Sequence, residues 1–131
     1  MSRICLDTCA YSHLKRGTPS AVAVIRSATW VGMPAVVLGE LRAGFLLGAR
    51  AIENEEELAA FCAEPVVHIM AIDGECARHY AEIVVALRRV GTPIPTNDLW
   101  IAAAGAASGS AVLTYDGHFR HIARVASIIL A

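Results

Sequence analysis

Short apolar runs alternate with longer helix-like segments along the whole chain, and this alternation limits the possible folds more than any other feature. The predicted strands cover residues 4–6, 35–38, 66–72, 111–114 and 127–130. Strands that are separated throughout by helices pair in parallel, and the helices then cover both faces of the sheet. The sequence therefore predicts an α/β fold with a parallel sheet, in a single domain over residues 1–131.

The predicted helices are marked by residues that typically start or stop a helix. Asn54 and Glu57 have the spacing of a capping box. Asp73 is well placed to cap a long helix that Gly91 ends. The predicted helices cover residues 10–14, 19 to about 32, from about 39 onward, from 54 onward, 74 to 91, 98 to about 109, and 118–124.

Four carboxylates stand at or near points where a strand-like run meets a helix-like run. Asp7, Glu40 and Asp116 follow apolar runs, and Asp98 opens a helical run. Because the carboxyl ends of parallel strands share one edge, where ligands bind, we expect these acids to meet in one cleft. Several negative charges are tolerable there only with a bound cation. Carboxylate and water ligands suit Mg²⁺ or Mn²⁺, and suit zinc poorly.

Each acid also has an ordinary structural explanation. Asp7 and Asp98 stand where helix caps stand, and Asp116 before Gly117 could form a turn. Glu40 could be a solvated helix residue. These alternatives stay open for each residue taken singly, whereas four acids gathered at one sheet edge favour a shared site.

Composition limits the partners of the chain. The net charge of −1, from 11 basic and 12 acidic residues, gives no global basic field, so contact with nucleic acid requires a local patch. Lys15, Arg16 and Arg42 are the candidates to hold a nucleic-acid backbone beside the acids. The hydrophobic share is 56%. Either another chain covers part of the apolar surface, or the excess is an alanine-rich core.

The cysteines and the N-terminal residues indicate the compartment. Four cysteines without a close pair favour neither a zinc site nor a disulfide framework. The N-terminus leads directly into the first predicted strand, without the pattern of a secretory leader. The longest uncharged stretch is interrupted by glycine and serine, which does not suit a membrane span. We expect a cytoplasmic protein that makes no membrane contact.

The acids and their neighbours resemble the PIN-domain family, and most closely the VapC-type toxins of toxin–antitoxin pairs. The resemblance extends over nearly the full length, in the segments Leu6-Asp7-Thr8, Gly39-Glu40-Leu41-Arg42-Ala43-Gly44, residues 95–103 around Asp98, and Leu113-Thr114-Tyr115-Asp116-Gly117-His118-Phe119. It implies a five-stranded sheet in the order 3-2-1-4-5. It also implies a Mg²⁺- or Mn²⁺-dependent endoribonuclease that leaves a 5′-phosphate and a 3′-hydroxyl, forms a homodimer and is silenced by a cognate antitoxin.

The resemblance assigns a role to each acid. Asp7 and Asp98 are implied as the leading metal ligands, and Asp116 joins them directly or through water. Glu40 completes the four catalytic acids. Thr114, two residues before the last acid, would orient carboxylates or water.

Other functions fit the residues less well. A phosphoacceptor receiver domain needs a lysine after a late strand, whereas the only lysine of this chain, Lys15, stands near its start. A haloacid-dehalogenase-like phosphatase needs a second aspartate where Cys9 stands. His118 and His121 could form a metal clip or be ordinary surface histidines. A nuclease acting on structured DNA, and a non-catalytic PIN-like module that binds RNA or protein, are the remaining alternatives.

Overall fold

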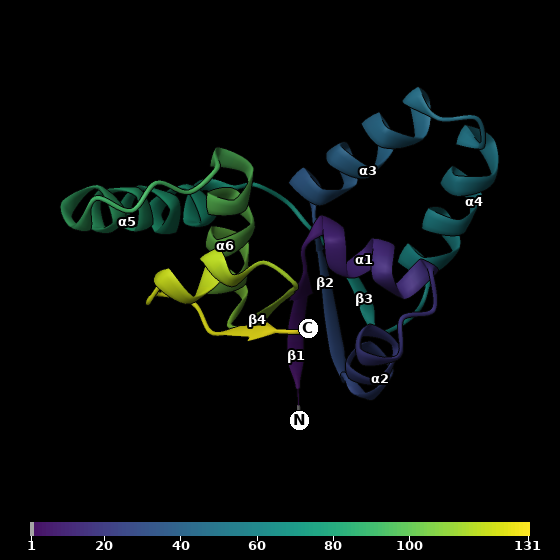
Figure 1. The fold of residues 1–131 in the computed structure, drawn as a ribbon, viewed down its shortest axis with the longest axis horizontal. Helices are drawn as coiled ribbons and strands as arrows, with labels where there is room; N and C mark the ends of the chain where they lie inside the picture. The colour runs from purple at the N-terminus through teal and green to yellow at the C-terminus, as the bar shows by residue number, and fades with distance from the viewer. Residues whose placement is uncertain (1) are drawn as a thin grey trace.

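The computed structural model describes residues 2–131, which form a five-stranded parallel sheet with helices on both faces (Figure 1). The expected single domain begins at Met1, which lies outside the described residues. The sheet order is β3-β2-β1-β4-β5, and every neighbouring pair is parallel, so the predicted fold class and strand order are confirmed. The strands are β1 (Arg3–Leu6), β2 (Trp30–Pro34), β3 (Val67–Met70), β4 (Ala111–Thr114) and β5 (Ser127–Ile129).

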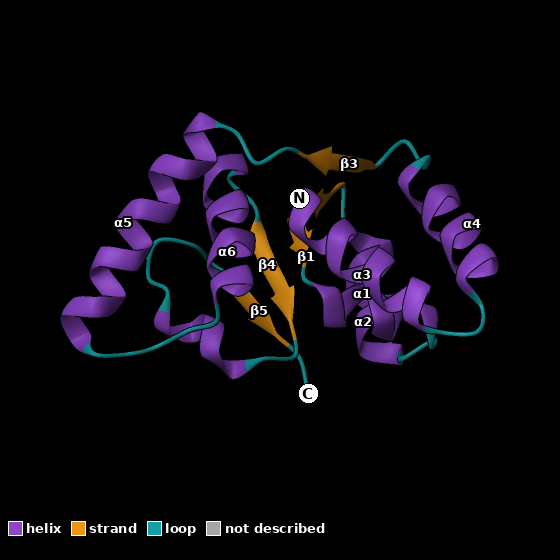
Figure 2. Cartoon of the chain, turned by 90° about the horizontal axis from the view of Figure 1, so that it is seen from above, coloured by secondary structure: helices purple, strands orange, loops and turns teal. Residues whose placement is uncertain are grey.

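The helices divide between the two faces of the sheet. One side carries α5 and α6, and the other carries α1 to α4 (Figure 2). The helices are α1 (Thr8–Lys15), α2 (Pro19–Ser27), α3 (Ala35–Leu47), α4 (Ala51–Cys62), α5 (Gly74–Val90), α6 (Thr96–Ser108) and the short 3₁₀ helix η1 (Gly117–His121). Because both faces are covered, Ile4, Leu6 and Leu113 of the central strands are fully buried. Ala102 and Ala103 of α6 are fully buried, and their small side chains allow this helix to lie close to the central strands.

The predicted second strand was wrong. Residues 35–38 form the first turn of α3, and the strand lies earlier, at Trp30–Pro34. Pro34 therefore ends the strand and precedes the helix, and the helix that begins at Pro19 ends at Ser27 rather than near Gly32. Short apolar runs have no periodicity that separates a buried strand from a buried helical turn. Here Val37 and Leu38 are buried as one face of a helix.

Other boundaries were predicted with mixed success. The capping box at Asn54 is absent: α4 begins at Ala51, and the Asn54 N–H donates to the carbonyl of Arg50. The predicted cap of α5 is confirmed, since Asp73 accepts a hydrogen bond from the Cys76 N–H, and Gly91 ends this helix with φ of 68°. The expected helix over residues 118–124 is the shorter η1, and the third strand is shorter than residues 66–72.

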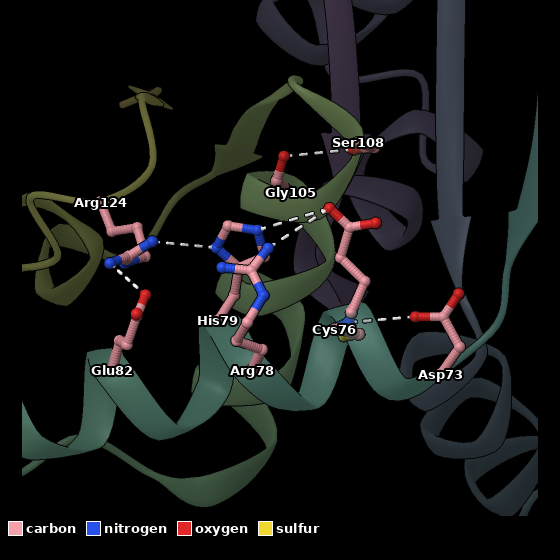
Figure 3. A network of polar contacts seen from close by, with 9 residues as sticks. Asp73, Cys76, Arg78, His79, Glu82, Gly105, Ser108 and Arg124 are labelled. Atoms are coloured by element: carbon pink, nitrogen blue, oxygen red, sulfur yellow. Dashed lines mark hydrogen bonds and ion pairs between the residues drawn. The ribbon is translucent and has the colours of Figure 1, made fainter.

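The segment after η1 is tied to α5 by a polar network (Figure 3). Arg124 forms an ion pair with Glu82 and hydrogen-bonds through Nη1 to His79 Nδ1 at 3.2 Å. His79 Nε2 and Arg78 approach the carboxylate of Glu75 at 4.0 and 3.6 Å. These contacts hold the C-terminal segment against the helical layer. Within residues 2–131, no helix has the length and apolar character that crossing a bilayer requires.

The absence of a side chain at Gly32 allows the side chains of Trp30 and Met70 to lie close to the backbone of β2. A Cβ atom added there would lie 2.8 Å from Cζ3 of the Trp30 ring and would also collide with Met70. The ring is held in place, since it stacks on His68 and Arg3 lies 4.2 Å from its centroid. The sheet face at this point therefore has no room for a side chain.

We expect Gly32→Ala to lower the free energy of unfolding by about 1–3 kcal/mol, because the rigid ring must shift. Urea denaturation measures the change. The matched control is Gly44→Ala on the exposed side of α3, where an added Cβ meets nothing within 4 Å. This control should gain about 0.5–1 kcal/mol. Equal stability changes in the two variants would contradict the packing argument.

Candidate metal-binding site

The N-terminal ends of α1, α3 and α6 approach one another beyond the carboxyl ends of β1 and β4 (Figure 1). All four predicted acids lie on the segments that meet there. Asp7 precedes α1, Glu40 lies in the second turn of α3, Asp98 in the first turn of α6, and Asp116 follows β4. The chain reverses its direction across the sheet between β1 and β4, where a ligand crevice is expected in such folds.

Asp7 and Thr114 occupy the floor of this site. Asp7 is only 5% exposed and accepts a hydrogen bond from the Ala10 N–H at 2.8 Å, so it also caps α1. Thr114 is fully buried on the adjacent strand, and its Oγ1 accepts from the Asp116 N–H at 2.9 Å. Burial raises the pKa of the Asp7 carboxyl, and the nearby Thr114 hydroxyl opposes this rise. Thr114 thus lies between the first and the last acid, and its orienting role stays a prediction.

Two polar neighbours hold the carboxylate of Glu40. Thr8 Oγ1 donates to its Oε1 at 2.7 Å, and Asn97 Nδ2 donates to its Oε2 at 3.2 Å. Sequence reasoning missed both contacts. Their positions in the sequence could have indicated these residues, since Thr8 directly follows Asp7 and Asn97 directly precedes Asp98. The contacts connect α1, α3 and α6, so they fix both oxygens of Glu40 in relation to the other acids.

The acids act on one another electrostatically. Burial, followed by the charges of Asp116, Asp7 and Glu40, raises the pKa of Asp98 to about 6. Burial also raises the pKa of Asp7, with smaller contributions in the same direction from Asp116 and Glu40. Such mutual effects place the carboxylates in one neighbourhood and show that their negative charge is poorly compensated.

No lysine or arginine within residues 2–131 forms an ion pair with any of the four acids. The imidazole of His118 lies beside Asp116, with 3.1 Å between His118 Nδ1 and Asp116 Oδ1. No group of three or more histidine, cysteine, aspartate or glutamate side chains in the described chain forms a ready-made metal cage. Mg²⁺, however, is commonly held by one or two carboxylates, with water and substrate phosphate completing its shell. The all-oxygen donors and the uncompensated charge therefore fit a hard divalent ion.

The three basic candidates differ in their surroundings. Arg42 Nε donates to Glu55 Oε1 at 2.7 Å, across the exposed surface between α3 and α4. Lys15 Nζ lies 5.7 and 5.9 Å from the ring centroids of Tyr11 and Phe61. Arg16 is exposed at the C-terminal end of α1, the helix whose N-terminal cap is Asp7.

The comparisons with known proteins agree with this arrangement. The family model described as PIN domain matches residues 4–125. The ribonuclease VapC5 of Mycobacterium tuberculosis is 32% identical over 125 residues, which are 94% of this chain and 90% of the relative. The chain belongs to the PIN-domain family, in its VapC branch.

Solved structures of VapC relatives share the fold. The crystal structure of VapBC-5 from Mycobacterium tuberculosis superimposes with a TM-score of 0.74 at 27% identity, covering 99% of this chain and 100% of the other. The structure of VapBC2 from Rickettsia felis bound to a DNA fragment reaches 0.85 over 98% of each chain, and at 20% identity this shows the fold alone. The predicted family is thereby confirmed. The catalytic, metal-binding and RNA-binding roles of individual residues stay predictions.

The two histidines that could have formed a metal clip have different neighbours. His118 contacts Asp116, while His121 is exposed at the end of η1 and lines a hollow with Ile83 and Val90 of α5. Both histidines are outside any described group of metal-ligating side chains. The interpretation as surface histidines near a helix end accounts for both.

Proposed function

We propose that this protein is the toxin of a toxin–antitoxin pair and acts as a divalent-metal-dependent endoribonuclease. The observation that carries the proposal is the meeting of four carboxylates at one sheet edge without a lysine or arginine ion pair within residues 2–131. An arrangement that only stabilised the fold would compensate this charge, because burying uncompensated charge costs free energy. Membership of the VapC branch supports the same chemistry.

Each acid has a distinct part in the proposed reaction. Asp7 and Asp98 would hold the metal, and Asp116 would complete the set of acidic ligands. Mg²⁺ or Mn²⁺, when bound, supplies an activated water and a positive charge for the phosphodiester. Glu40 is held by Thr8 and Asn97, so it faces the site with a fixed orientation and positions water. The Thr114 hydroxyl fixes the positions of the Asp7 carboxylate and the Asp116 backbone relative to each other.

RNA is proposed to approach over the basic residues beside the acids. Arg16 is the leading candidate for a backbone contact because it is exposed at the end of α1, the helix that Asp7 caps, and forms no ion pair within residues 2–131. Lys15 lies one residue before it, and Arg42 would have to exchange Glu55 for a phosphate. Arginine binds phosphate in a bidentate manner, which suits this role.

Protein partners are part of the proposal. The solved relative from Mycobacterium tuberculosis is a member of the VapBC family of toxin–antitoxin systems, and we propose that a cognate antitoxin binds this chain. Leu46, Leu47 and Ile52, at the junction of α3 and α4, are 80%, 91% and 77% exposed. An apolar surface of this kind is typical of protein interaction sites, and it supports an antitoxin and a homodimer as partners. We place the protein in the cytoplasm, where four free thiols suit a reducing compartment.

The proposal is tested by incubating the purified chain with RNA in Mg²⁺, in Mn²⁺ and in excess EDTA. Cleavage should require the metal and leave 5′-phosphate ends. Asp7→Asn should abolish cleavage while keeping the cap of α1, since the Asn oxygen can still accept from the Ala10 N–H. Expression should arrest growth, and co-expression of the antitoxin should relieve the arrest. Cleavage in EDTA would defeat the metal mechanism, and RNA binding without any cleavage would favour a non-catalytic module.

Thr8→Val is expected to lower RNA cleavage by roughly tenfold or more, as is usual for the loss of a group that orients a catalytic carboxylate. The substitution keeps the shape of the side chain and leaves Glu40 Oε1 without its 2.7 Å hydrogen bond. Cleavage rates at saturating metal measure the effect, and Thr8→Ser should restore most of the rate. The control is Thr29→Val, because the Thr29 hydroxyl donates to the Ser2 carbonyl at the other end of the strands, far from Glu40 in the fold. Equal rates in Thr8→Val and the wild type would contradict the orienting role.

A further inference from the structure

An aromatic pair next to the acids has no part in the proposed cleavage. The His13 ring of α1 stacks on the Tyr115 ring, which follows β4, with 3.8 Å between centroids and 24° between planes. His13 Nδ1 is hydrogen-bonded to Thr18 Oγ1 at 2.9 Å, and the Tyr115 hydroxyl to Ser20 Oγ at 2.7 Å. Both rings are therefore fixed by polar contacts as well as by each other. We call these two rings the His13–Tyr115 stack.

The stack lies close in sequence to Asp116 and to the turn at Arg16 and Gly17. Tyr115 lies between Thr114 and Asp116, so the stack is one residue away from the proposed site in the chain. Between His13 and Thr18 the chain turns at Gly17, with φ of 73°, and Arg16 in this turn is exposed. The stack therefore lies next to Asp116 in the chain, and Arg16 follows it at the C-terminal end of the helix that Asp7 begins.

Both rings of the stack are partly exposed. Stacking uses one face of each ring and leaves the other outside the pair. Nε2 of His13 makes no hydrogen bond within residues 2–131, so a polar edge also stays available. Unpaired nucleobases bind to such surfaces, because every base has a flat π face and histidine or tyrosine can stack on it.

We propose that the His13–Tyr115 stack is a nucleobase subsite that positions the nucleotide next to the scissile phosphate. This inference rests on the proposed ribonuclease function. The base stacks on the free face of His13, Arg16 contacts a neighbouring phosphate, and the bond to be cleaved lies at the acids. Because Thr18 and Ser20 already fix the rings, little side-chain freedom is lost on binding. His13 is thus a substrate-positioning residue and takes no part in the chemical step.

A simple clamp between α1, α2 and β4 would explain the same contacts. The two explanations differ in one respect, since only a base subsite responds to the removal of a base from the RNA. Replacing His13 by Phe keeps a flat ring, and replacing it by Leu keeps apolar contact with Tyr115 but removes the flat face. This pair of variants separates stacking from packing. His121→Ala on η1 is the control, because His121 is an exposed histidine outside the stack.

The experiment measures the binding of short oligoribonucleotides that span a mapped cleavage site. Each oligoribonucleotide carries an abasic residue at one position, and binding is measured in the cleavage-deficient Asp98→Asn background with Mg²⁺ present. In the background protein, the abasic residue next to the scissile bond should weaken binding about five- to hundredfold, the range for one stacked base. His13→Leu should reduce this penalty to less than about twofold, while His13→Phe and His121→Ala should retain it.

The possible results separate the subsite from the proposed function. An abasic penalty that is the same in His13→Leu and the background protein, or no penalty at any position, would overturn the subsite while ribonuclease activity stands. A complete lack of RNA cleavage by the wild-type protein in Mg²⁺ and Mn²⁺ would overturn both. Thermal unfolding of each variant accompanies the binding data. If His13→Leu fails to fold, Tyr115→Leu takes its place. An abasic penalty that His13→Phe keeps and Tyr115→Leu loses supports the subsite. The same abasic penalty in these two variants overturns it.

Discussion

Asp98→Asn is expected to abolish RNA cleavage and at the same time to raise the melting temperature of the metal-free protein at neutral pH. The first effect follows from the loss of a metal ligand and should be at least about a hundredfold, because losing even a group that supports a ligand costs 10–100-fold. The second follows from electrostatics. The pKa of Asp98 is raised to about 6, so the charged carboxylate is unfavourable in the native state at neutral pH. Asparagine carries no charge and removes this repulsion from Asp116, Asp7 and Glu40.

The two effects are measured together. Cleavage is followed on total RNA in saturating Mg²⁺, and unfolding is followed by fluorescence in EDTA. Asp73→Asn is the matched control, since Asp73 caps α5 through the Cys76 N–H and asparagine can keep that bond. The control should leave both quantities nearly unchanged. A lower melting temperature for Asp98→Asn would show that the carboxylate stabilises the fold, and retained cleavage would remove Asp98 from the site.

In vivo, the same substitution should relieve growth arrest without preventing association with the antitoxin. Asp98 is half-buried at the start of α6, away from the exposed apolar residues at the junction of α3 and α4. An inactive protein that still co-purifies with its antitoxin would separate the loss of catalysis from misfolding. Continued arrest by a soluble Asp98→Asn protein would indicate that toxicity does not depend on this acid.

The gathering of the acids could be predicted from sequence because it depends on topology. In a parallel sheet every strand ends at the same edge, so residues that follow strands meet whatever their separation in the chain. Asp7 and Asp116 follow β1 and β4, which are hydrogen-bonded neighbours with Leu6 opposite Leu113. No side-chain detail is needed for that inference. The strand order itself came from resemblance, since periodicity carries no information about which strands pair.

The location of Glu40 was predicted despite an error in the element before it. The sequence placed Glu40 directly after a strand over residues 35–38, whereas it lies in the second turn of α3. The site tolerates this error because α3 begins directly after β2, so its first turns stand at the same sheet edge. The contacts from Thr8 and Asn97 could not be predicted, because they depend on the angle between three helices. The stacking of His13 on Tyr115 depends on it in the same way.

The pH dependence of metal binding provides a test that does not require RNA. A metal ligand must be deprotonated, so a proton on Asp98 competes with the ion. With the pKa of Asp98 at about 6, affinity for Mg²⁺ should be nearly constant above neutral pH. It should fall by about tenfold for each pH unit below the pKa, as binding that releases one proton requires. Calorimetry of the full chain at several pH values measures this dependence, and an affinity that is constant down to about pH 4.5 would contradict it.

The same shift predicts the pH dependence of stability without metal. The folded-state pKa of Asp98 lies above its usual value of 3.8, so the native state binds the proton more tightly than the unfolded chain. The stabilisation from this proton is complete below about pH 4 and is lost as the pH rises through about 6. Mg²⁺ reverses the loss by compensating the charge, so the rise in melting temperature on adding Mg²⁺ should be larger at neutral pH than near pH 5. Asp98→Asn removes the proton and the ligand together, so this variant should show a smaller loss of stability between about pH 4 and 6 and a weaker pH-dependent response to Mg²⁺. A variant that kept both effects in full would assign them to another acid, and Asp7 is the candidate because burial raises its pKa as well.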